Sequence, residues 1–126
     1  MGSKTPKVIA VANTKGGVAK TTTCLSLGGG LVEQGYLALL VDLDPQAHLT
    51  ASVGVKPDKL RRTVSDVLLD QNSLTEISRE TSVFGLDLAP ANDELVVIDK
   101  MLYKHAGYEY RLKTDIEQMP NKLYDV

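Results

Sequence analysis

The run NTKGGVAKTTT, residues 13–23, constrains the fold of this chain more than any other stretch. It lies between a short apolar run at residues 7–12 and a longer, partly apolar one. The common phosphate-binding loop, G-x-x-x-x-G-K-[ST], has glycine six positions and one position before its lysine. Counting back from Lys20, those positions hold Thr14 and Ala19. The run looks like a phosphate loop without matching the usual pattern.

The chemistry of this run favours an anion site if a strand precedes it and a helix follows. A helix N-terminus presents unpaired backbone N–H groups and a partial positive charge. Gly16 and Gly17 let the backbone wrap closely around an anion because neither carries a Cβ. Lys20 adds charge for the β- and γ-phosphates, and Thr21 offers a hydroxyl to Mg²⁺. The plainer alternative is a glycine-containing turn with solvated lysines.

The rest of the chain predicts an α/β fold, with a parallel sheet and flanking helices in one domain over residues 1–126. The glycines at 28–30 weaken the first helix, and close packing on the sheet is the preferred explanation. Residues 123–126, LYDV, look like the first step of a fourth strand. Strands are predicted at residues 7–12, at 36–43, where both faces would be buried, and at 85–90, and residues 44–59 are expected to be mostly loop. Helices are predicted at 21–34, ending at Gly35, at 63–69 with Thr63 as the cap, and from Ser73, which has the capping-box spacing to Glu76. A fourth helix would run from the cap Asn92 to His105 and stop at Gly107, with Leu95, Ile98 or Met101, and Leu102 on one face, and a fifth would contain Leu112, Ile116 and Met119 and end at Pro120.

Composition removes several classes of function. The 126 residues carry a net charge of −2, and the sequence has no polybasic tail that would indicate nucleic-acid binding. The single cysteine, Cys24, cannot form an internal disulfide, which fits a reducing cytoplasm. The longest apolar run, residues 36–41, is far too short to span a membrane. The sequence therefore predicts a cytoplasmic protein that does not act on a membrane.

A second motif, VDLDPQ at residues 41–46, follows the second predicted strand. In open parallel sheets, ligands bind outside the carboxyl ends of strands. Asp42 and Asp44 would share one face of a regular strand, but Pro45 makes a regular continuation unfavourable and leaves their directions open. One would face the metal through water and the other the γ-phosphate. A lone aspartate at a strand end is more often a cap or a turn residue, and it is the pairing with the lysine-bearing loop that favours a site.

Together, KGGVAKTT and VDLDPQ resemble the deviant-Walker-A ATPases of the ParA/Soj type, which partition chromosomes and plasmids. LAPAN at residues 88–92 and EYRL at 109–112 are similar to further parts of that family. The resemblance implies a P-loop NTPase fold with ATP and Mg²⁺ as cofactors. It also implies an ATP-dependent homodimer that binds DNA without sequence preference and is stimulated by a ParB-like partner.

The resemblance assigns roles to individual residues. Lys15 would reach across the dimer to the partner's phosphates, much as an arginine finger does. Lys20 would hold the β- and γ-phosphates, and Thr21 would bind Mg²⁺. Asp44 would orient or activate the attacking water, and Asp42 would support the metal shell through water. The implied cofactor-binding set is Lys15, Gly16, Gly17, Val18, Ala19, Lys20, Thr21 and Thr22, and the implied first switch region is residues 45–50.

The chain also departs from the family pattern. Glycine is commoner than alanine at position 19, and the helix at 28–30 is usually rich in alanine. The family continues beyond the point of Val126 with an apolar strand ending in aspartate, the Walker B element, which lies beside the loop strand. It also supplies later the adenine contacts, much of the dimer surface and the DNA-binding face. The resemblance therefore implies the N-terminal portion of a partition ATPase that is incomplete relative to the family.

Three alternatives stay open. The chain is a non-catalytic fragment or interaction module, or a ParA-like ATPase that positions another cargo, or, least favoured, a membrane-bound MinD-like protein. The remaining polar residues have plain explanations: His48 as a solvated loop residue, Cys24 as a small buried side chain, and Arg61 and Arg62 as a solvated pair. The tyrosines lack the interleaved basic residues of a nucleic-acid platform, so packing is favoured for Tyr103, Tyr108 and Tyr110.

Overall fold

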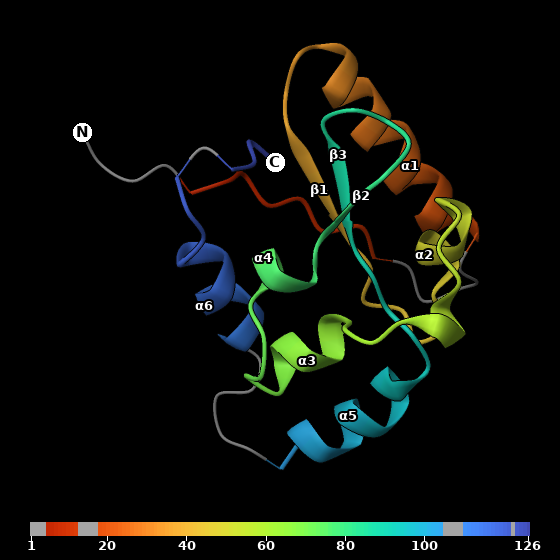
Figure 1. Cartoon of the computed structure of the whole chain (residues 1–126), viewed down its shortest axis with the longest axis vertical. Coiled ribbons are helices and arrows are strands. Elements are labelled where there is room, and N and C mark those ends of the chain that lie inside the picture. The colour runs from red at the N-terminus through yellow and green to blue at the C-terminus, as the bar shows by residue number, and fades with distance from the viewer. Residues whose placement is uncertain (1–4, 13–17, 105–109, 122) are drawn as a thin grey trace.

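The computed structural model describes residues 5–12, 18–104, 110–121 and 123–126. Its centre is a three-stranded sheet in the order β1-β3-β2 (Figure 1), built from β1 (Ala38–Val41), β3 (Leu86–Ala89) and β2 (Arg79–Glu80). β1 runs parallel to β3, whereas β2 runs antiparallel to it. The expected purely parallel sheet is therefore corrected to a mixed one. The reason is local, because the short link from β2 to β3 cannot make the long crossover that parallel strands need.

Helices cover both faces of the sheet (Figure 1). α1 lies on one face, where Cys24, Leu25 and Val32 pack against a buried cluster that includes Leu40 and Leu88. The other face carries a second cluster, built mainly by α3 to α6. None of the helices within the described residues is long and apolar enough to cross a bilayer. The helices are α1 (Val18–Glu33), α2 (His48–Ser52), α3 (Val64–Leu68), α4 (Leu74–Ile77), α5 (Glu94–Leu102) and α6 (Arg111–Glu117), with a 3-10 turn at Pro57–Lys59.

Side-chain caps stabilise the first turns of α3 and α4, as predicted. The Thr63 side chain accepts a hydrogen bond from the N–H of Ser65 at 3.2 Å, and Asp66 accepts one from the N–H of Thr63 at 2.8 Å. Ser73 and Glu76 form the same reciprocal box ahead of α4. Each cap satisfies N–H groups that the helix leaves unpaired and contributes about 1 kcal/mol.

The later helices follow their predicted apolar faces. α5 begins at Glu94, whose N–H donates to the Asn92 side chain at 3.1 Å, so Asn92 caps from just outside the helix. Its buried residues are Leu95, Ile98 and Leu102, whereas Met101 is exposed, which decides between the two candidates for that face. The predicted stop at His105 and Gly107 lies outside the described residues. In and just after α6, the predicted residues Leu112, Ile116 and Met119 pack against the second cluster.

Only the first of the three consecutive glycines is explained by close packing. A Cβ on Gly28 would lie 3.0 Å from Leu86 Cδ1 and 3.1 Å from Leu40 Cδ2. Gly29 and Gly30 have no neighbour within 4 Å of such an atom. α1 therefore packs closely on the sheet at Gly28, and the packing explanation is wrong for the other two.

The prediction of a buried strand at residues 7–12 is wrong. This segment forms no strand, and its Val8 and Ile9 are 65% and 47% exposed. A strand needs a neighbour for its backbone groups, and here the C-terminal tail intervenes: Lys7 N–H donates to the Asp125 carbonyl at 2.9 Å. On its other side, the tail pairs with the start of β1, since Val126 N–H donates to Leu37 and Leu39 N–H donates to Val126. The tail thus lies beside the start of β1, but residues 123–126 form no strand, so the expected first step of a fourth strand is absent from this segment.

Two further boundaries differ from expectation. β1 covers only Ala38–Val41 of the predicted 36–43, and α1 begins three residues earlier than predicted. The predicted loop at 44–59 contains α2 and a 3-10 turn. α2 follows a tight turn in which Ala47 adopts a left-handed backbone, with φ at 55°. Ala47 N–H donates to the Asp44 carbonyl at 2.8 Å, and such a turn leaves no apolar periodicity in the sequence.

The tail is clamped by Tyr124, which generates a pH-dependent prediction. The Tyr124 hydroxyl donates to Asp87 Oδ2 at 2.6 Å. Burial first, and then the bond to the Asp87 carboxylate and its charge, raise the pKa of Tyr124. The folded state therefore favours neutral tyrosine. The contribution of Tyr124 is complete below the unfolded pKa of about 10 and is lost as the pH rises through the higher folded value.

Tyr124→Phe is expected to lower the free energy of unfolding by about 1 kcal/mol at neutral pH, the usual contribution of one hydrogen bond. Above pH 10 or so, its stability should fall less steeply than that of the unmodified chain. Urea unfolding followed by circular dichroism from neutral to alkaline pH measures both effects. The matched control is Tyr36→Phe at an exposed tyrosine. Equal alkaline slopes for the unmodified chain and Tyr124→Phe would contradict the clamp.

Candidate functional site

Four predicted site residues border one cavity of about 620 Å³. Lys20 and Thr21 come from the first turn of α1, and Asp42 and Asp44 follow β1. The cavity thus joins the start of a 16-residue helix to the carboxyl end of a parallel strand. Both are places where backbone geometry favours anionic ligands. Residues of both motifs therefore border the same cavity.

The central part of the loop lies outside the described residues, and Lys15, Gly16 and Gly17 belong to it. Val18 is the first residue of α1. Ala19 is also helical, so alanine occupies this glycine position with a right-handed backbone that it adopts without strain. Thr22 is exposed on the same helix.

The Asp42 carboxylate is the most tightly held acidic group at the cavity. It is only 3% exposed. Its Oδ2 accepts the backbone N–H of Thr50 at 2.9 Å and the Thr50 hydroxyl at 2.6 Å, while Oδ1 accepts the Asp44 N–H at 3.1 Å. A carboxylate has about four acceptor positions, so one remains, on Oδ1.

Among the described residues, no lysine, arginine or histidine forms an ion pair with Asp42. Buried charges in proteins are normally paired or near a metal ion, so this carboxylate fits a site that receives positive charge from elsewhere. The described part of the chain holds no group of three or more His, Cys, Asp or Glu residues that could bind a metal by itself. A hydroxyl from Thr21 and the remaining acceptor position of Asp42 border the same cavity, and they fit Mg²⁺ of the kind held mainly by phosphates, waters and one or two side chains.

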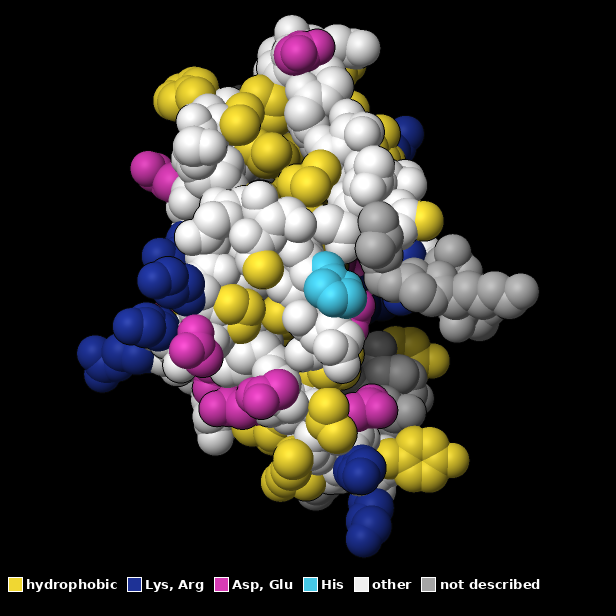
Figure 2. Space-filling model, turned by 90° about the vertical axis from the view of Figure 1, so that its right-hand side faces the viewer, with side chains coloured by type: hydrophobic (Ala, Val, Ile, Leu, Met, Phe, Trp, Pro, Cys, Tyr) yellow, Lys and Arg dark blue, Asp and Glu magenta, His cyan; other side chains and the backbone are white. Residues whose placement is uncertain are grey.

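Asp44 is held by the turn that follows it. Its Oδ1 accepts the Gln46 N–H at 3.0 Å, and its Oδ2 lies 4.0 Å from His48 Nδ1. The side chain of Asp44 is 29% exposed and that of His48 is 48% exposed. Figure 2 shows a histidine side chain, in cyan, at the surface. The expectation of a solvated His48 holds, and its approach to Asp44 was not predicted.

Thr50 is the polar residue at the site that sequence reasoning missed. It was assigned only to the end of a switch region, yet it is fully buried and bonded to Asp42. Its hydroxyl also accepts the Ala91 N–H at 3.0 Å, which joins it to the exit of β3. A threonine shortly after a D-x-D-P-Q run, with no apolar periodicity to explain it, was the only available signal.

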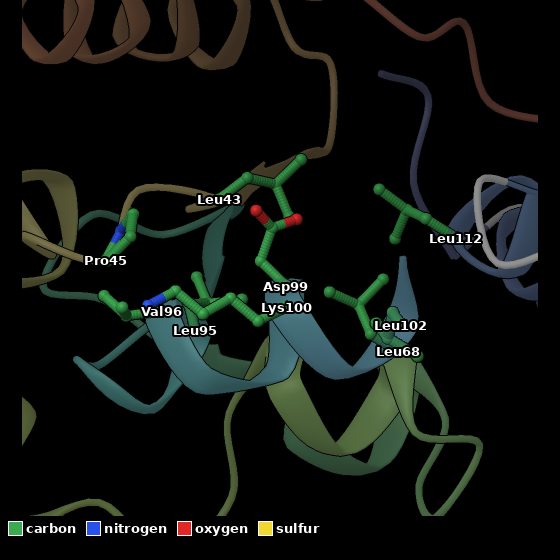
Figure 3. A pocket seen from close by; sticks show the side chains of 9 residues that line it. All are labelled: Leu43, Pro45, Leu68, Leu95, Val96, Asp99, Lys100, Leu102 and Leu112. Carbon is green, nitrogen blue, oxygen red and sulfur yellow. The ribbon is translucent and has the colours of Figure 1, made fainter. Parts of the chain in front are cut away.

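A second pocket of about 520 Å³ lies against α5 (Figure 3). It shares Leu43, Pro45 and Leu112 with the first cavity. In Figure 3 the Asp99 carboxylate points towards Leu43, and most of the surrounding side chains are apolar. None of Lys20, Thr21, Asp42 and Asp44 lines this pocket, so the candidate site is the first cavity.

Cys24 borders the first cavity but is not an activated nucleophile. It is partly buried and packs against the cluster under α1. Burial first, and the negative charge of Asp42 second, raise the pKa of Cys24. A raised pKa leaves less thiolate, which is the reactive form.

We expect alkylation of Cys24 by iodoacetamide to rise to half its maximum rate at a pH above the ordinary cysteine value of about 8.5. Mass spectrometry of the intact chain measures the rate across pH. The matched control places the thiol on the surface, as Cys24→Ala combined with Ser82→Cys at an exposed position. If both thiols reacted with the same pH midpoint, the assigned environment of Cys24 would be wrong.

Comparison with known proteins places these features in a family context. The sequence profile of a family described as AAA domain matches residues 6–126. The sporulation initiation inhibitor protein Soj of Bacillus subtilis is 39% identical over 111 residues, which cover 88% of this chain and 44% of Soj. The chromosome partitioning protein ParA of Caulobacter vibrioides is 36% identical over 117 residues, covering 93% of this chain and 44% of ParA.

A solved structure is also similar. Cobyrinic acid a,c-diamide synthase from Mycobacterium smegmatis, with bound ATP analog and magnesium, superposes with a TM-score of 0.85 and 49% identity. The match covers 90% of this chain and 46% of the synthase. The chain therefore spans less than half the length of each of these three proteins.

Proposed function

Because this chain belongs to the ParA/Soj-type family of AAA-domain P-loop ATPases, we propose that it forms the phosphate-binding part of an ATP-hydrolysing partition protein. One observation carries the proposal: Lys20, Thr21, Asp42 and Asp44 border a single cavity where α1 begins and β1 ends. The buried charge of Asp42, which no basic side chain among the described residues pairs, supports it, because the carboxylate fits beside a cation that arrives with the nucleotide.

Each residue has a distinct task in this proposal. MgATP, when bound, supplies the phosphoanhydride bond and a cation that offsets its charge. Lys20 binds the β- and γ-phosphate oxygens, and Thr21 gives its hydroxyl to the cation. Asp42 uses the remaining acceptor position on Oδ1 to orient a water molecule of the metal shell. Asp44 orients the attacking water and accepts its proton.

The assembly of the whole protein is part of the proposal. Lys15 would contact the nucleotide of a second copy, so that ATP drives formation of a homodimer. The dimer would bind DNA without sequence preference and respond to a ParB-like partner in chromosome or plasmid segregation. Soj and ParA, which support this role by similarity, are more than twice as long as the matched region. The further parts of such a protein would carry the DNA and adenine contacts.

Other functions share the same phosphate site. The 49% identity to cobyrinic acid a,c-diamide synthase favours, as a second candidate, an ATP-using synthase. A ParA-like ATPase that positions a different cargo would use the same residues. Stimulation of ATP hydrolysis by double-stranded DNA would favour partition over synthesis.

Lys20→Ala is expected to weaken binding of MgATP by about tenfold or more, because it removes a charge-assisted contact to phosphate. Isothermal titration calorimetry on this chain measures the affinity. Lys59→Ala, at an exposed lysine away from the cavity, serves as the control and should bind like the unmodified chain. Unchanged affinity in Lys20→Ala would rule out the proposed phosphate site.

Asp44→Ala should retain MgATP binding and lose at least about tenfold in turnover, because it removes the group that orients the attacking water. Lys15→Ala should lose turnover together with ATP-dependent dimerisation. Phosphate release and analytical ultracentrifugation measure the two properties. MgATP binding without turnover in the unmodified chain would favour the non-catalytic alternative for these 126 residues.

A further inference from the structure

Thr50 joins three segments that are far apart in the sequence. Its hydroxyl donates to Asp42 Oδ2 at 2.6 Å and accepts the Ala91 N–H at 3.0 Å. Its own backbone N–H donates to the same Asp42 oxygen at 2.9 Å. Thr50 and Ala91 are fully buried, and Asp42 nearly so. The end of β1, helix α2 and the exit of β3 therefore meet at one threonine side chain.

The direction of every hydrogen bond in this group is determined by chemistry. The Ala91 N–H can only donate, so the Thr50 oxygen must accept from it. The single hydroxyl proton of Thr50 is then left for Asp42. Oδ2 of Asp42 already accepts two bonds from Thr50, so the acceptor position that remains belongs to Oδ1. Thr50 thus determines which carboxylate oxygen keeps a free acceptor position.

The same group also holds the backbone of Asp44. Asp42 Oδ1 accepts the Asp44 N–H at 3.1 Å, so the Asp44 backbone follows the orientation of the Asp42 carboxylate. Between Asp44 and Thr50, Ala47 is buried in a left-handed conformation that costs an L-residue about 1 kcal/mol or more. Bonds at both ends of this turn offset that cost, and those of Thr50 form the closing end.

We propose that Thr50 is a positioning residue of the phosphate site. It aims Oδ1 of Asp42 at the metal shell and fixes the turn that carries Asp44, with the Ala91 N–H as its anchor on β3. This inference rests on the proposed function, because it assumes that Mg²⁺ and nucleotide phosphates are the ligands. The inference also assigns a role to the LAPAN run, because the Ala91 N–H in this run anchors the loop that follows β1.

Two substitutions separate positioning from space filling. Thr50→Val keeps the shape of threonine and removes the hydroxyl, whereas Thr50→Ser keeps the hydroxyl and removes a methyl group. The probe is ATP, titrated by calorimetry with and without Mg²⁺. We expect Thr50→Val to reduce the gain in ATP affinity from Mg²⁺ by about tenfold, the usual effect of one hydrogen bond to a charged group. Thr50→Ser should retain most of that gain, and ATP binding without Mg²⁺ should change little in either variant.

Hydrogen exchange of the Ala91 amide provides a readout independent of nucleotide. It should be faster in Thr50→Val than in Thr50→Ser or the unmodified chain. Thr114→Val, at an exposed threonine of α6, is the control for the substitution itself. If Thr50→Val does not fold, Thr50→Ala and Thr50→Ser form a second pair that differs by the hydroxyl.

The outcomes distinguish the two proposals. If the unmodified chain binds MgATP but loss of the hydroxyl leaves the Mg²⁺ effect unchanged, Thr50 does not position the site, while the proposed function stands. If the unmodified chain shows no Mg²⁺-dependent binding of ATP, the proposed function fails and the inference fails with it.

Discussion

The arrangement around the candidate site depends on one buried negative charge, the carboxylate of Asp42. Burial of a carboxylate is costly, and here three hydrogen-bond donors offset part of that cost. Two of the donors belong to Thr50, eight residues further along the chain. The carboxylate therefore ties α2, through Thr50, to the end of β1. The remaining negative charge makes the same place attractive to a cation.

Sequence reasoning succeeded where structure depends on residues a few positions apart. The boxes at Thr63 and Ser73, the stop at Gly35 and the apolar face of α5 all have that local origin. Helix α2 has no comparable local signal, because it follows a left-handed alanine and is held by bonds to Asp42, which lies eight residues before Thr50. The bond from Ala91 to Thr50 spans 41 residues and could not be read from spacing. The site was therefore predictable as a meeting of two motifs, but the threonine that joins them was not.

The strand prediction for residues 7–12 failed because a strand depends on distant neighbours, which local sequence does not reveal. The composition of this run suits a buried strand, but a strand is stabilised by its neighbours and not by composition alone. Ala38 and Asp42 direct their N–H groups to the β3 side, so Leu39 between them faces the other edge, where it donates to Val126. Beyond that contact, the cavity runs between residues 7–12 and β1. Val8 and Ile9 are thus exposed because they line this cavity and do not pack against β1.

Similar chains can carry different functions because the residues that bind phosphate and metal are not the ones that select the reaction. In the proposed function, Lys20, Thr21, Asp42 and Asp44 bind phosphate, metal and water, which a partition ATPase and an ATP-using synthase would both need. Selection between such functions must come from other groups, because a fold and a phosphate site do not determine the acceptor of the reaction. Lys15 is the residue of the loop that bears on this choice, since its proposed role exists only in a dimer. Thr50 belongs with the residues that both kinds of enzyme would need. By orienting Asp42 it would support any reaction in which the metal and the attacking group must be aligned, whatever that group is.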